Sequence, residues 1–139
     1  MKRDRGEYRP IYEVLLDGPD WQRLSSDARL VFIALKLKCG GFGIRIIAGL
    51  VESLSQWTGL SSRRCMTACK SLEQSGWIQR EGNVVWVVRG LEFEPTMDAA
   101  NANHRKAFAR LVDALPSLPI VGRFRAAYPQ WDTPSPSDG

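Results

Sequence analysis

Residues 58–88 decide the fold, and they read TGLSSRRCMTACKSLEQSGWIQREGNVVWVV. A tight Thr-Gly turn at 58–59 is followed by Ser61, whose hydroxyl can accept a backbone N–H of a first helical turn. A helix is therefore predicted over about residues 61–75. It ends at Gly76, because glycine readily adopts the positive φ that closes many helices.

One face of this predicted helix is apolar. Its members recur at i, i+3, i+4 and i+7, which places them on a single stripe facing the core: Cys65, Ala68, Cys69 and Leu72. Free cysteine is usually buried, so Cys65 and Cys69 are interpreted as small buried hydrophobes. A redox role for the pair is the alternative, and it would require both thiols to leave the core.

The opposite face is polar and basic, and it carries Ser62, Arg63, Arg64, Met66, Thr67, Lys70 and Ser71. Arg63 and Arg64 lie in the first turn, where the helix dipole disfavours cations by about 0.3–1 kcal/mol each. An external anion would offset that cost, so the pattern favours a phosphate or a guanine edge near these arginines. Two merely solubilising arginines are the alternative.

Two short apolar strands follow the helix, at residues 77–80 and 84–88, joined by a two-residue turn at Gly82-Asn83. Arg80 lies on this hairpin and is a candidate phosphate contact. A helix-turn-helix followed by a β-hairpin is the layout of a winged helix, which commonly places its second helix in a DNA major groove.

The preceding residues supply the rest of such a domain. A serine-capped start at residues 24–27 opens a helix that runs to Cys39, and residues 43–47 suit a short strand. Residues 48–58 are predicted as the helix before the Thr-Gly turn. Four of its apolar side chains are expected to face inward: Leu50, Val51, Leu54 and Trp57.

The predicted fold class is mainly α (α+β): a winged helix-turn-helix with a short wing and two appended C-terminal helices. The chain divides into a mobile basic arm (1–9), the winged-helix domain (10–90), a connector (91–100), a C-terminal helical segment (101–130) and a disordered tail (131–139). One appended helix covers 101–115, and the other begins near Pro119. Whether these helices pack on the domain stays open.

Composition limits the function classes. The net charge of +4 permits a polyanionic partner. Three cysteines without a Cys-x-x-Cys pair, and a single histidine, His104, argue against a metal site and against triad or dyad catalysis. No phosphate-binding glycine loop is present. We therefore expect no enzyme, no cofactor and no metal. Without a long apolar run or an export signal, we expect no membrane association and a cytoplasmic protein.

The segments Leu24 to Arg29 (LSSDAR), Thr58 to Ser61 (TGLS) and Leu72 to Ile78 (LEQSGWI) resemble those of the winged-helix domains of phage and prophage replication proteins, and more broadly of bacterial winged-helix regulators. The segment at 103–131 looks like the tails of such phage-type proteins. The resemblance implies double-stranded DNA as partner. It matches Ser62, Arg63, Met66, Thr67 and Lys70 to recognition-helix positions, Arg64 to a phosphate contact and Arg80 to the wing.

Three functions compete. The first is a DNA-binding protein of a phage, prophage or plasmid replication module that contacts replisome proteins through its C-terminal helices. The second is a transcriptional regulator that dimerises through residues 101–128, since the apolar stripes of these residues need a partner. Whether the chain is a monomer or a homodimer tests this hypothesis. The third is a protein-binding adaptor, suggested by Met66 within the presumed reading face.

Overall fold

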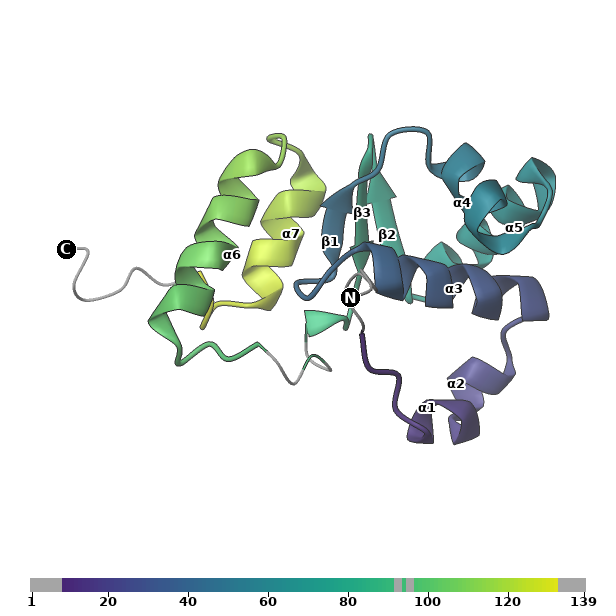
Figure 1. Cartoon of the computed structure of the whole chain (residues 1–139), viewed down its shortest axis with the longest axis horizontal. Helices are drawn as coiled ribbons and strands as arrows, with labels where there is room; N and C mark the ends of the chain where they lie inside the picture. The colour runs from purple at the N-terminus through teal and green to yellow at the C-terminus, as the bar shows by residue number, and fades with distance from the viewer. Residues whose placement is uncertain (1–8, 92–93, 95–96, 133–139) are drawn as a thin grey trace, which may run out of the picture.

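The computed structural model describes residues 9–91, 94 and 97–132 of the 139-residue chain (Figure 1). The predicted arm at 1–9 and tail at 131–139 lie largely outside these residues. In chain order the elements are α1 (Val14–Asp17), α2 (Pro19–Gln22), α3 (Ser26–Lys38), β1 (Ile44–Ile46), α4 (Leu50–Thr58), α5 (Ser62–Gln74), β2 (Ile78–Glu81), β3 (Val84–Val87), α6 (Ala102–Ala114) and α7 (Pro119–Ala127).

Side-chain caps begin the longer helices, as the sequence predicts for α3 and α5. The Ser25 hydroxyl accepts the backbone N–H of Ala28 at 3.1 Å, and the Ser61 hydroxyl accepts that of Arg64 at 3.2 Å. At the other end, Gly59 after α4 has a φ of 78°, so the Thr-Gly turn predicted at residues 58–59 is left-handed.

The three strands form an antiparallel sheet in the order β1-β3-β2. β2 and β3 are the predicted hairpin, and Arg80 stands opposite Val85 across it. β1 joins the other edge of β3, with Ile44 opposite Trp86. The central strand of the sheet is therefore the last of the three in sequence.

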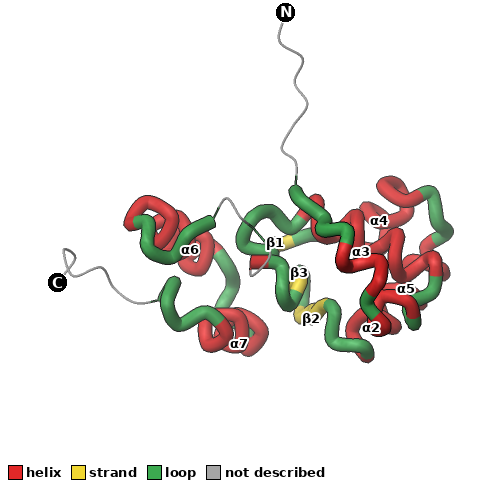
Figure 2. The backbone as a smooth tube through the Cα atoms, turned by 90° about the horizontal axis from the view of Figure 1, so that it is seen from below, coloured by secondary structure: helices red, strands yellow, loops and turns green. Residues whose placement is uncertain are grey.

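Helices cover both faces of this sheet (Figures 1 and 2). Side chains of a strand alternate between faces. Val85 and Val87 belong to the core shared with α3, α4 and α5, whereas Val84 and Trp86 belong to the core shared with α6 and α7. All four residues of β3 are buried for this reason.

The second core answers the question that the sequence left open. Phe108 of α6 stacks on Phe124 of α7 with ring centroids 5.3 Å apart, and Phe124 meets Trp86 of β3 edge-on at 5.7 Å. Trp131 is also buried and packs on Phe108 at 5.9 Å. The apolar faces of the two C-terminal helices thus lie against the sheet. The core extends to Trp131, which the predicted tail at 131–139 includes.

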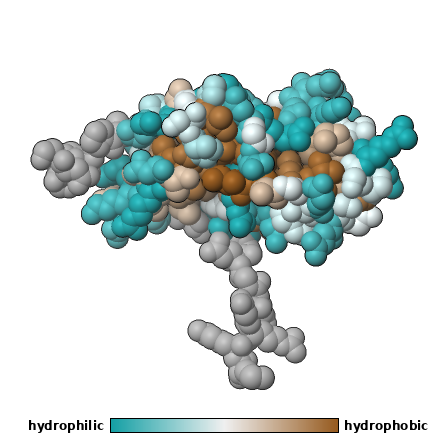
Figure 3. Space-filling model, turned by 90° about the horizontal axis from the view of Figure 1, so that it is seen from above, coloured by the Kyte–Doolittle hydropathy of each residue, from teal (hydrophilic) through white to brown (hydrophobic). Residues whose placement is uncertain are grey.

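Trp57 departs from the prediction that it faces inward. It is 36 % exposed, and the ammonium of Lys38 lies 4.8 Å from its ring centroid. α4 ends at the next residue, so its own helix does not continue over the indole. Seen from above, the surface in Figure 3 likewise shows apolar patches bordered by polar side chains.

The architecture is α+β, with a small antiparallel sheet between two groups of helices. Within the described part of the chain, the structure has no helix of the length and apolarity needed to cross a membrane.

Candidate nucleic-acid interface

The polar face of α5 is the most extended set of predicted contact residues that the structure brings together. Ser62, Arg63, Thr67 and Lys70 are all exposed on it. With a rise of 1.5 Å per residue, positions 63 and 70 are separated by about 10 Å along the helix axis. That span fits a DNA major groove about 12 Å wide.

The buried side of α5 fixes the orientation of this face. Cys65 and Cys69 have no exposed surface, which confirms that they serve as core residues. They pack in the cluster that also contains Leu35 of α3 and Leu54 of α4. Because α3, α4 and β2 hold α5 from one side, its polar side points away from the protein.

Arg63 and Lys70 are the available cations of the face. Neither has an ion-pair partner among the residues that the structure describes. The Thr67 hydroxyl donates to the carbonyl of Arg63 at 3.1 Å, so it is oriented by its own helix. Two charged side chains and two hydroxyls are consequently presented together.

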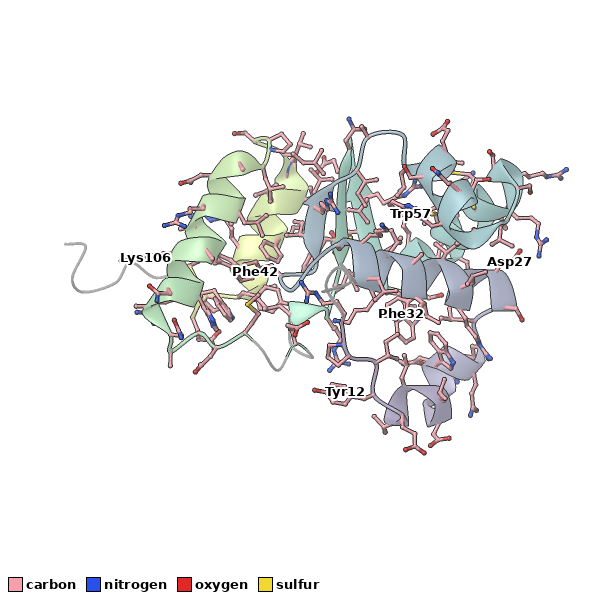
Figure 4. The ribbon with its side chains drawn as sticks, in the orientation of Figure 1. Tyr12, Asp27, Phe32, Phe42, Trp57 and Lys106 are labelled. Atoms are coloured by element: carbon pink, nitrogen blue, oxygen red, sulfur yellow. The ribbon has the colours of Figure 1, made fainter. Side chains whose placement is uncertain are left out.

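Arg64 has an internal partner. Its Nε and Nη2 donate to the two carboxylate oxygens of Asp27 at 2.8 and 2.7 Å. Asp27 lies in the first turn of α3, and Figure 4 shows it at the end of that helix beside α5. The hydrogen bond from Arg64 lowers the pKa of Asp27 and in turn raises the pKa of Arg64.

This pair changes the role expected for Arg64. Its side chain is 60 % exposed, so it stays at the rim of the face, but a phosphate would have to compete with Asp27. Sequence reasoning did not find the pair because the two residues are 37 positions apart. The local sequence places Asp27 only in the first turn of a serine-capped helix.

Arg80 and Met66 are also engaged with each other. The guanidinium of Arg80 pairs with Glu73 of α5 through Nε and, at 3.4 Å, through Nη2. The same Nη2 lies 3.9 Å from the Met66 sulfur. The hydrogen bond to Glu73 raises the pKa of Arg80. Met66 is half-buried, so this cluster borders the exposed face instead of extending it.

The hairpin makes its other polar contacts with α7. Glu81 accepts the backbone N–H of Ile120 at 2.7 Å, and Arg123 donates to Gln79 at 2.7 Å. Leu118 packs close to Gly82 at the hairpin turn. The predicted wing is therefore partly covered by a helix of the same chain.

His104, Cys39 and Cys69 each have a defined environment in the fold. His104 accepts the backbone N–H of Asp98 through Nδ1 at 3.0 Å, which fixes it at the start of α6. Burial raises the pKa of the Cys39 thiol to about 12 and that of Cys69 to about 11. Both thiols are thus protonated near neutral pH and poorly nucleophilic.

Comparison of the chain with protein-family models, with curated proteins and with solved structures finds no match.

Proposed function

We propose that the protein is a winged helix-turn-helix protein that binds double-stranded DNA, with α5 in the major groove. Arg63 and Lys70 make the electrostatic contacts in this proposal, while Ser62 and Thr67 face base edges or phosphates. The resemblance of residues 24–29 and 58–78 to phage-type replication proteins suggests a replication module as the setting.

The observation that carries the proposal is the presence on α5 of two exposed cations, Arg63 and Lys70, that have no ion-pair partner among the described residues. Cations in the first turn are disfavoured by the helix dipole, and Arg63 has no carboxylate partner within the described residues. The order of elements gives further support. A helix, a strand, two helices joined by a left-handed glycine and a hairpin follow one another, as in winged helices.

The structure weakens the support for both alternatives. The regulator hypothesis relied on apolar stripes of residues 101–128 that needed a partner, and these stripes are buried against the sheet. The adaptor hypothesis is motivated by Met66 within the reading face and by the modest net charge of +4. Met66 is half-buried beside Arg80, so only the net charge continues to favour it. DNA binding retains its exposed residues.

The proposal is tested by fluorescence anisotropy of a mixed-sequence duplex at several salt concentrations. Each phosphate contact contributes about −0.9 to the slope of log K against log salt. Replacing Arg63 and Lys70 together by Ala should therefore flatten the slope by about 2.

A matched control removes the same charge elsewhere. Lys106 and Arg110 are exposed on α6, at the opposite end of the molecule from α5 (Figure 4). Changing both to Ala should leave most of the slope intact. Equal losses in the two double variants would reject α5 as the contact helix, and no binding at low salt would reject the function.

A further inference from the structure

Helix α3 is apolar on two opposite sides. One side is buried in the core with α4 and α5. With about 100° of rotation per residue, Leu30, Ile33 and Leu37 fall together on the other side, which we call the outer stripe of α3. Leu30 and Leu37 are 40 % and 46 % exposed, and Ile33 is half-buried between them. Helices that are apolar all round are normally buried, so the outer stripe is a candidate contact surface.

Trp57 of α4 adds an exposed aromatic ring near the C-terminal end of the outer stripe. α4 packs against α3 in the shared core. The ammonium of Lys38, the residue after Leu37, lies 4.8 Å from the centroid of the Trp57 ring. Tryptophan is enriched among the side chains that contribute most of the binding energy in protein interfaces. The stripe and this ring together therefore resemble a protein-binding surface.

The charges at this end of α3 are positive. Arg45 of β1 donates through Nη1 to the Lys38 carbonyl at 3.0 Å, which brings a second cation to the end of the helix. Within residues 9–91, 94 and 97–132, neither Lys38 nor Arg45 has an ion-pair partner.

The acidic side chains of the two helices lie elsewhere. Asp27, the acid of α3, is about 16 Å from Lys38 along the helix axis and already accepts hydrogen bonds from α5. Glu52, the acid of α4, is rotated by about 140° from Trp57 around its helix. An apolar surface with a positive border is complementary to an apolar surface with a negative border.

We propose that the outer stripe of α3 and Trp57 dock an amphipathic helix of a partner protein, and that this helix carries acidic side chains beside its apolar face. The apolar face covers Leu30, Ile33 and Leu37. The carboxylates pair with Lys38 and Arg45.

Other occupants fit this surface less well. Leucine and isoleucine side chains offer no hydrogen bond to a phosphate backbone, so nucleic acid would leave the stripe unused. A second copy of the chain would bring the same positive border. Leu37 and Lys38 lie at the opposite end of α3 from the Asp27–Arg64 pair, and the proposal does not depend on DNA binding.

The test uses a fluorescein-labelled peptide of about four helical turns, with leucines on one face and glutamates beside them. A second peptide has lysine in place of every glutamate. Fluorescence anisotropy measures both against the full chain. We expect micromolar binding of the acidic peptide and at least about tenfold weaker binding of the basic one, because like charges oppose association.

Four variants locate the contact, and all four positions are exposed, so the core is kept. Leu37→Ala should weaken binding of the acidic peptide about fivefold or more, whereas Leu16→Ala, an equally exposed leucine on α1, should not. Lys38→Ala should narrow the difference between the two peptides. Its control is Lys106→Ala, which removes the same charge from α6.

Several results would overturn the proposal. They are equal affinities for the two peptides, equal losses in Leu37→Ala and Leu16→Ala, and no binding at millimolar peptide. A dimer in sedimentation that Leu37→Ala abolishes would instead identify a second copy as the occupant. Binding of a single-stranded oligonucleotide of thymidines that Lys38→Ala abolishes, without binding of the acidic peptide, would identify nucleic acid.

Discussion

Replacing Asp27 by Asn should strengthen DNA binding. In the free protein Asp27 holds Arg64 by two short hydrogen bonds at the rim of the α5 face. Asn keeps the size of the side chain but removes its charge, so it competes far less for a guanidinium. Arg64 then becomes available to a phosphate, and a negative charge near the DNA disappears.

The expected size follows from the number of cations. With Arg63 and Lys70 as phosphate contacts, the slope of log K against log salt is about −1.8. Release of Arg64 adds one contact and brings the slope to about −2.7. Across a fourfold rise in salt, the variant should therefore lose about 3.5-fold more affinity than the natural chain, starting from tighter binding at low salt.

The assay is duplex anisotropy at four or more salt concentrations. Asp113→Asn on α6 is the control, because it removes the same charge from an exposed position far from α5 (Figure 1). An unchanged slope in Asp27→Asn would show that Arg64 does not reach DNA. Weaker binding would show that Asp27 is needed to orient Arg64, and either outcome would refute the reasoning.

Three further predictions concern stability and reactivity. Phe108→Ala should lower the free energy of unfolding by about 3–5 kcal/mol, since the ring is fully buried. Urea titrations followed by tryptophan fluorescence measure this loss. A loss below about 1 kcal/mol, as at an exposed site, would contradict the core between the sheet and the C-terminal helices. Iodoacetamide at pH 8 should alkylate Cys39 and Cys69 only after unfolding, because burial raises their pKa values to about 12 and 11. Mass spectrometry detects the alkylation, and rapid labelling of the native protein would contradict this prediction. The hydrogen bond from Arg64 lowers the pKa of Asp27 from 3.8, so the stability that the pair contributes is present above pH 3.8 and disappears as pH falls through the lower folded value. The difference in urea midpoint between the natural chain and Asp27→Asn should be constant near neutral pH and shrink toward pH 2. A difference that grows on acidification would contradict this sign.

Features governed by neighbouring residues were predictable from the sequence. The caps at Ser25 and Ser61, the left-handed Gly59 and the apolar stripe of α5 each depend on residues within a few positions. The hairpin turn at 82–83 belongs to the same group. Local rules therefore located most helices and strands, and they identified the exposed side of α5.

Contacts between distant segments were not predictable. The partner of Arg64 is 37 residues away, and the carboxylate that caps α7 comes from Glu81, 39 residues before it. A sequence pattern shows that a face is polar, but not which opposite charge folds against it. This limit explains why Arg64 and Arg80 looked available in the sequence and are paired in the structure.

The burial of β3 on both faces also determines where the chain can be shortened. A fragment ending at residue 100 would keep α3, α4 and α5 but lose both helices that cover Val84 and Trp86. The uncovered side of the sheet would be an apolar surface, which favours self-association over solubility. For recombinant expression, the C-terminal boundary consequently belongs after Trp131, and the half that contains α3, α4 and α5 is best studied with its C-terminal helices attached.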